Sequence, residues 1–137
     1  MKHKILQLFL FSVAGFGIGY VLTNSIKFGI CIANQTATDA SCINFFERIG
    51  DPVFFGMGAL AFVFLILFFI PRAFSAWFKF AIWFVPLAAV IFITAPEPQG
   101  WVSPIPSPES VFQWVSAFYV IVSVAIIGLV ALRKKGS

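Results

Sequence analysis

The only two cysteines of the chain, Cys31 and Cys42, are separated by ten residues and are the first candidates for chemistry. Two thiols can form a structural disulfide, exchange electrons as a redox pair or bind a metal ion. Redox pairs favour closely spaced thiols, often Cys-x-x-Cys, beside a cation or a helix start that lowers the pKa of one thiol. Because the spacing here is wider, we predict a structural disulfide, which would stabilise its loop by roughly 3 kcal/mol. A redox-active pair is the alternative.

Small and polar side chains inside the apolar segments form two stripes at helical spacing. The first stripe contains Ser12, Gly15, Gly19 and Thr23. Its G-x-x-x-G pair lets helix backbones approach closely. The second stripe contains Gln113, Ser116, Tyr119 and Ser123. Its polar groups should face the protein interior because lipid cannot satisfy them, although such a stripe can also line a pore or a substrate path. We predict that these two faces form the core of a helix bundle.

Ionisable residues are absent from the middle of every long apolar segment. Coupled transporters, proton pumps and channels generally place such residues, or unwound Gly and Pro segments, near the middle of the membrane. Catalysis there would need a nucleophile with a base or a metal, and the chain contains no Ser-His, Glu-x-x-His or carboxylate cluster. The two cysteines cannot complete a zinc site, because we expect the sole histidine, His3, on the other side of the membrane. We therefore expect no catalytic residue, no metal site and no cofactor.

The composition places these residues in a membrane. Of the 137 residues, 61% are hydrophobic and 10% are charged, whereas soluble domains contain about 25% charged residues. A transmembrane helix needs about 20 predominantly apolar residues. Four segments qualify: residues 5–23, 52–70, 78–95 and 110–132. We predict one all-α membrane domain over residues 1–137, a bundle of four transmembrane helices.

Proline and capping residues predict where these helices begin and end. Asp51 before Pro52 is typical of an N-cap followed by the first helical residue. Residues 107–109, Ser-Pro-Glu, repeat this pattern before the fourth helix, where the carboxylate also favours the positive end of the helix dipole. Pro71 should end the second helix, and Pro86 should kink the third because it removes one helical hydrogen bond.

The distribution of Lys and Arg predicts the orientation. One side of the membrane receives Lys2, Lys4, Arg72, Lys79, Arg133, Lys134 and Lys135, and the other receives Lys27 and Arg48. The excess of cations on the cytoplasmic side of membrane proteins then places both termini in the cytoplasm and residues 24–51 and 96–109 outside. Since these cations are dispersed, nucleic acid is not an expected partner. Aromatic belts predict Trp77 and Trp83 at the inner interface and Trp101 and Trp114 at the outer one.

The two external loops are the expected contact surfaces. Residues 41–49 carry apolar side chains at helical spacing and predict a short interfacial helix, which Gly50 would end. Five prolines between positions 96 and 108 predict an extended, semi-rigid strap. The candidates for partner contact are Phe46, Arg48 and Trp101.

The first apolar segment also has the basic start and apolar core of a cleaved signal peptide. Its apolar run is long, and no small-x-small site followed by a polar stretch closes it. We therefore expect this segment to be retained as a membrane helix.

These features favour a small integral protein of the plasma (inner) membrane. We expect a non-catalytic accessory or structural subunit of the cell envelope that acts through helix packing and external-loop contacts. Its expected partners are membrane lipids and either a membrane or envelope protein or a second copy of the chain. One alternative is an envelope thiol oxidoreductase that uses the two cysteines. The other is a small channel, transporter or lipid-handling protein built around the polar stripe of residues 113–123.

Overall fold

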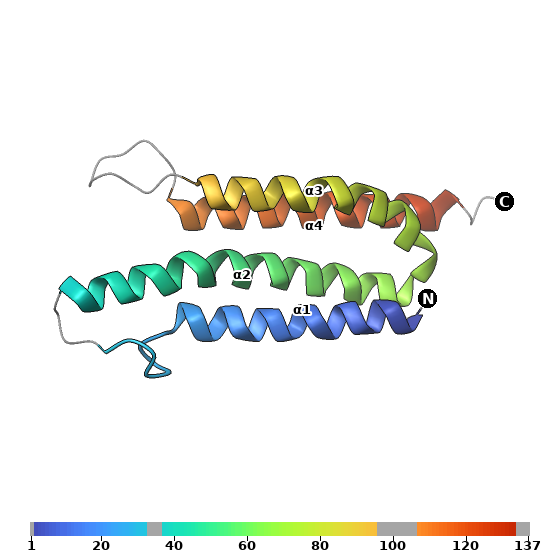
Figure 1. Ribbon diagram of the computed structural model, residues 1–137. Coiled ribbons are helices and arrows are strands. Elements are labelled where there is room, and N and C mark those ends of the chain that lie inside the picture. The colour runs from blue at the N-terminus through green and yellow to red at the C-terminus, as the bar shows by residue number, and fades with distance from the viewer. Residues whose placement is uncertain (1, 33–36, 96–106, 134–137) are drawn as a thin grey trace.

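The computed structural model describes residues 2–32, 37–95 and 107–133, and within these ranges the chain is mostly helical. The elements are α1 (Lys2–Thr23), α2 (Ala37–Phe69), the short 3-10 helix η1 (Pro71–Ala73), α3 (Phe74–Thr94) and α4 (Pro108–Arg133), as Figure 1 shows. All four α-helices are long and apolar enough to cross a membrane. The predicted fold class, an all-α membrane protein with four spanning helices, is confirmed.

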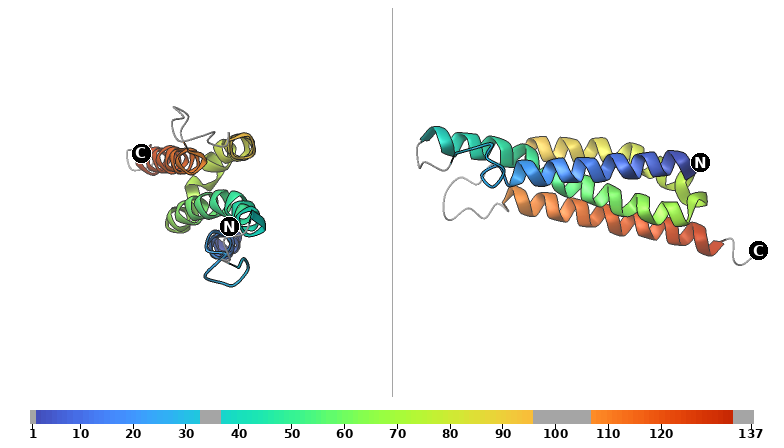
Figure 2. Two further views of the ribbon diagram at one scale, coloured as in Figure 1. Left: turned by 90° about the vertical axis from the view of Figure 1, so that its left-hand side faces the viewer. Right: turned by 90° about the horizontal axis from the view of Figure 1, so that it is seen from below.

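The four helices lie side by side and alternate in direction, so the start of α1 and the end of α4 lie at the same end of the bundle (Figure 1). We call this the terminal end. The opposite end, which holds the start of α2, the start of α4 and residues 24–32, is called the disulfide end. Seen along the helix axes, α1 packs against α2 on the side away from α3 and α4 (Figure 2). Helix α4 contacts both α2 and α3.

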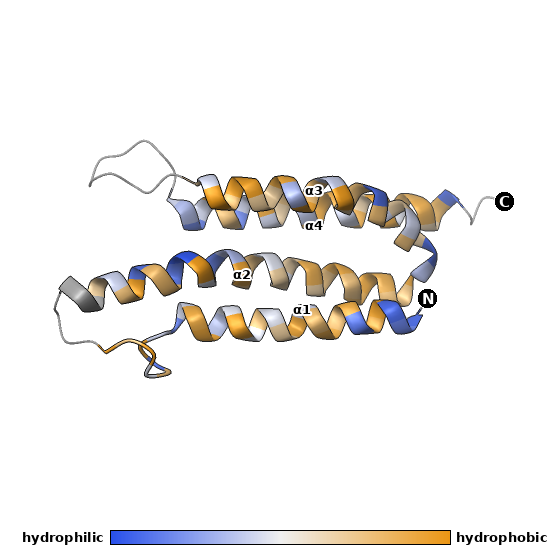
Figure 3. Ribbon diagram, viewed as in Figure 1, coloured by the Kyte–Doolittle hydropathy of each residue, from blue (hydrophilic) through white to orange (hydrophobic). Residues whose placement is uncertain are grey.

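Apolar residues make up most of the length of the four helices (Figure 3), and their side chains are found both in the interior and on the outside of the bundle. Inside, Val63 and Leu67 of α2 pack with Trp77 of α3 and with Ile127 of α4. Outside, many large Phe, Leu and Ile side chains remain exposed along the helices. Such a surface is stable where hydrocarbon is the solvent, and the hydrogen bonds of each helix satisfy its own backbone.

The second helix begins at Ala37 and not at Pro52, because the predicted short helix and the predicted membrane helix are one continuous helix. The prediction of Asp51 as an N-cap and of Gly50 as a helix terminator is wrong. Contacts with α1 involve both residues, as described below, and they favour continuation over the local capping signal. Pro52 then lies inside the helix, where it lacks the N–H that would bond to the preceding turn.

Two other helix ends agree with the predicted local chemistry, and the start of α3 differs from its prediction. Ser107 Oγ accepts a hydrogen bond from the backbone N–H of Ser110 at 3.4 Å, and Pro108 is the first residue of α4. Helix α2 ends at Phe69, just before Pro71 begins η1. Helix α3 begins at Phe74, earlier than residue 78, and continues through Pro86.

Candidate functional site at the disulfide end

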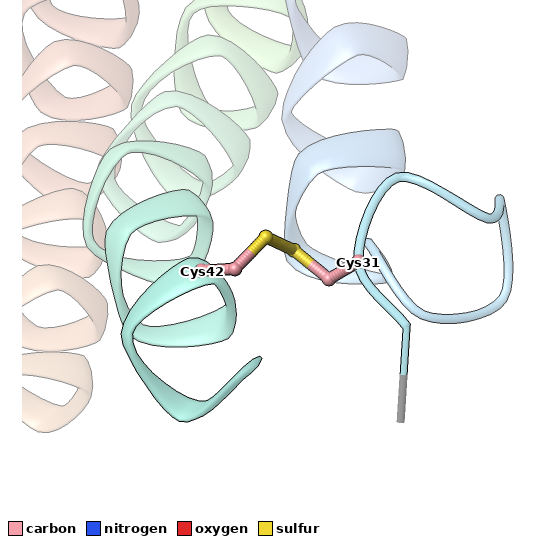
Figure 4. The surroundings of a disulfide bond; sticks show 2 residues. All are labelled: Cys31 and Cys42. Carbon is pink, nitrogen blue, oxygen red and sulfur yellow. A yellow bond between two sulfur atoms is a disulfide. The ribbon is translucent and has the colours of Figure 1, made fainter. Parts of the chain in front are cut away.

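Cys31 and Cys42 form a disulfide that joins the segment after α1 to the first turns of α2 (Figure 4). Their Cα atoms are 6.1 Å apart. The predicted disulfide is confirmed, with the difference that Cys42 belongs to a helix and not to a loop. Cys31 is 3% exposed, so an attacking thiolate has little access to its sulfur, and thiol exchange depends on such access.

The segment between α1 and Cys31 is folded into a defined turn. The carbonyl of Ser25, a buried residue, accepts hydrogen bonds from the backbone N–H groups of Ile30 at 2.9 Å and Cys31 at 3.3 Å. Gly29 has a φ of 70°, a left-handed conformation that glycine adopts without steric penalty. The ring of Phe28 meets Tyr20 of α1 edge to face, with 6.2 Å between centroids. The turn and the disulfide together fix this segment against the bundle.

The first sequence stripe packs against α2. Ser12 is buried, and its hydroxyl donates to the carbonyl of Leu8 within α1 at 2.9 Å. A Cβ added at Gly19 would lie 2.5 Å from the backbone nitrogen of Phe54. A Cβ added at Gly15 would lie 2.8 Å from Cγ of Met57, which is part of a flexible side chain. The closest approach of the two backbones in this region is therefore at Gly19.

Thr23 links the last turn of α1 to α2. Its hydroxyl lies 2.9 Å from the carbonyl oxygen of Gly19 and 3.2 Å from Oδ1 of Asp51, and it can donate to either. A Cβ added at Gly50 would lie 2.8 Å from the backbone nitrogen of Thr23. Sequence reasoning assigned Gly50 to a helix end because a glycine near a cap and a glycine at a helix crossing look alike in one sequence.

The second stripe lies on the face of α4 that meets α2 and α3, with one exception. Tyr119 and Ser123 are buried, and the hydroxyl oxygen of Ser116 is buried although the residue itself is partly exposed. Gln113 is exposed, and its amide donates to Oε1 of Glu109 at 3.4 Å. The prediction that Gln113 faces the interior is wrong, because near the helix start its long side chain finds an acceptor one turn away on its own helix.

Trp77 is buried between helices. The sequence-based prediction that it lies at the inner membrane interface is wrong. Its indole N–H donates to Oγ of Ser123 at 3.2 Å, and its ring meets Phe64 edge to face with 5.2 Å between centroids. Trp83, in contrast, is exposed on the outside of α3. The reason for the error is that Ser123 offers a hydrogen-bond acceptor inside the bundle, so the indole can be buried without losing its partner.

Apolar side chains are exposed at the disulfide end, on residues 24–32 and 40–50, which we call the platform. They are Ile26, Phe28, Ile30, Ile32, Phe45 and Ile49. The predicted contact residues Phe46 and Arg48 belong to this platform, with Phe46 partly buried and Arg48 exposed. Trp101 lies outside the described residues. The alternation of apolar residues at positions 26, 28, 30 and 32 was the sequence signal that could have identified this surface.

Carboxylates also gather at this end. Asp51 lies close enough to both Glu47 and Glu109 for their charges to repel. Within the described ranges, however, no group of three or more His, Cys, Asp and Glu side chains is arranged to hold a metal ion. The platform therefore offers apolar and charged contact surface, with the disulfide as its covalent brace.

A comparison with models of protein families, with curated proteins and with solved structures finds no match to this chain.

Proposed function

We propose that this protein is a non-catalytic accessory or structural subunit of the cell envelope, which binds a membrane or envelope protein through the platform. In this proposal it resides in the plasma membrane with both termini in the cytoplasm. Lys2, Lys4, Arg72 and Arg133 lie at the terminal end or in the turn between α2 and α3, which supports that orientation. A disulfide at the opposite end would persist in the oxidising exterior.

The observation that carries the proposal is that the platform has exposed apolar residues, is held by a disulfide and includes the start of α2, a helix longer than the membrane is thick. Helix α2 has 33 residues, which is about 50 Å at 1.5 Å per residue, whereas the hydrocarbon core is about 30 Å thick. The first turns of α2 can therefore project about 20 Å beyond the hydrocarbon. Exposed apolar residues near water or headgroups mark contact surfaces, and ordering them in advance lowers the entropy lost on binding.

The disulfide weighs against the thiol oxidoreductase alternative. Cys31 is buried, and the hydrogen bonds to Ser25 hold its backbone in a fixed turn. A redox pair instead needs a thiolate that a partner can reach. A redox titration measures the reduction potential of this cysteine pair. A value below about −300 mV is typical of a structural disulfide.

Co-purification in mild detergent tests the proposal. A variant with both Phe28→Ala and Phe45→Ala removes two exposed aromatic rings from the platform, and Phe11→Ala removes an equally exposed ring from the middle of α1. We expect wild type and Phe11→Ala to retain the same partner, and the platform variant to lose it at least tenfold. A monomer without a reproducible partner, or equal recovery from all three proteins, would contradict the proposal.

A further inference from the structure

A groove of about 560 Å³ lies between α2 and α3, with α4 as its floor. Small residues on its two walls leave this space open, among them Gly56 and Ala59 of α2 and Ala88 and Ala89 of α3. Helices α2 and α3 do not pack closely on each other, so the groove opens sideways toward the surrounding lipid. Its volume is in the range of sites that bind small molecules.

A hydroxyl group on the floor of the groove has no hydrogen-bond partner. The hydroxyl oxygen of Ser116 is buried and unpaired, whereas the hydroxyl of Tyr119 lies beside Ser123 and Trp77. Ser116 lines the groove. A buried unpaired polar group costs about 1–3 kcal/mol, so the Ser116 hydroxyl would gain from a ligand that offers it an oxygen acceptor.

Arg48 is the one charged side chain among the described residues that line this groove, and it lies at the disulfide end of it. From Arg48 to Leu60 the wall formed by α2 runs twelve residues, or about 18 Å. One leaflet of the hydrocarbon core is about 15 Å thick. The groove is therefore about as long as one lipid chain, with a cation at the end where a headgroup would lie.

The depth of the Ser116 hydroxyl matches the ester region of a lipid. Trp114, two residues before Ser116 on α4, is exposed on the outside of the bundle, and exposed Trp residues favour the boundary between headgroups and hydrocarbon. Ser116 then lies about 3 Å further into the membrane. Ester carbonyls lie just below the headgroup and only accept hydrogen bonds, which suits a hydroxyl donor.

We infer that the groove binds one anionic glycerophospholipid from the leaflet at the disulfide end. Its phosphate lies near Arg48, an ester carbonyl accepts a hydrogen bond from Ser116, and one acyl chain fills the space beside Gly56 and Ala88. This site is separate from the platform, so loss of the platform's partner would leave lipid binding unchanged.

Native mass spectrometry of the purified protein tests this site, with phosphatidylglycerol and phosphatidylcholine of identical chains as probes. Wild type should retain one phosphatidylglycerol per chain and prefer it over phosphatidylcholine about tenfold, as a charge-assisted contact predicts. Arg48→Gln should remove the preference. Ser116→Ala should weaken binding about fivefold, the usual effect of one lost hydrogen bond.

Two matched Gly→Leu changes separate the groove from general effects on the helices. A Cβ at Gly56 would meet only Phe92, at 3.7 Å, so a leucine there enters the groove, whereas Gly128 of α4 has nothing within 4 Å. Gly56→Leu should weaken lipid binding at least tenfold, and Gly128→Leu should leave it unchanged. A thermal melt checks folding, and if Gly56→Leu fails to fold, Arg48→Gln and Ser116→Ala decide between the outcomes. Wild-type binding in all these variants, or no lipid retained by wild type because water fills the groove, would overturn the inference.

Discussion

The close contact between α1 and α2 at Gly19 gives a sharp prediction about stability. In Gly19→Ala, the new Cβ would lie 2.5 Å from the nitrogen and 2.7 Å from the Cα of Phe54. Carbon atoms in contact prefer about 3.5–4.0 Å, so the helices must separate by about 1 Å. Because the opposing atoms belong to a helix backbone, no side-chain rotation can relieve the clash.

Overpacking of this kind typically costs 1–3 kcal/mol, so we expect a loss of about 2 kcal/mol for Gly19→Ala. That loss corresponds to about a 30-fold change in the unfolding equilibrium. Titration of the detergent-solubilised protein with SDS, followed by pulse proteolysis, measures it. Gly50→Ala should behave in the same way, because its Cβ would lie 2.8 Å from the backbone nitrogen of Thr23.

Two other glycines of α1 serve as controls on the same helix. Gly17 has nothing within 4 Å of an added Cβ, so Gly17→Ala should cause no loss of stability. At Gly15 the added Cβ meets the side chain of Met57, which can rotate, and Gly15→Ala should lose less than about 1 kcal/mol. Equal unfolding midpoints for Gly19→Ala and Gly17→Ala would refute the assigned packing of α1 on α2.

Three further predictions concern single contacts. Replacement of both cysteines, Cys31→Ser and Cys42→Ser, should lower the free energy of local unfolding of residues 24–32 by about 3 kcal/mol. Amide hydrogen exchange in these residues should then be faster, and unchanged protection would contradict the role of the disulfide. Ser123→Ala removes the hydroxyl that accepts a hydrogen bond from the indole N–H of Trp77 and should cost about 1 kcal/mol in the SDS titration; a wild-type midpoint would contradict this. Gly29→Ala forces alanine into a left-handed conformation and should cost about 1 kcal/mol, read as lost protection of the Ile30 and Cys31 amides, whereas retained protection would argue against that turn.

Hydropathy predicted the four helices because a spanning helix must be long and apolar, whatever its neighbours are. The start of α4 followed from Ser107 and the end of α2 from Pro71, which act within a few residues. The disulfide also followed, because the chain has two cysteines and both were assigned to the same side of the membrane. These features depend on local chemistry and on counting, which one sequence contains.

Most of the features that failed depend on contacts between helices, and Gln113 is the exception because its partner Glu109 lies on its own helix. Asp51 was predicted to be an N-cap, but its carboxylate accepts a hydrogen bond from Thr23 of α1. Trp77 was predicted to lie at the membrane interface, but its indole N–H donates to Ser123 of α4 inside the bundle. The groove was also invisible, since small residues such as Gly56 and Ala88 could equally have packed against a neighbouring helix. In each of these interhelical cases a residue more than twenty positions away decides the outcome.

Site-specific photo-crosslinking in native membranes tests the central claim, that the platform binds a protein partner. A photoreactive phenylalanine analogue at Phe28 (52% exposed) or Phe45 (59% exposed) probes the platform, and one at Phe11 (66% exposed) probes the lipid-facing side of α1. We predict one discrete protein adduct, shared by both platform positions and absent from position 11. Adducts with lipid alone at all three positions, or the same protein adducts at position 11, would contradict the account.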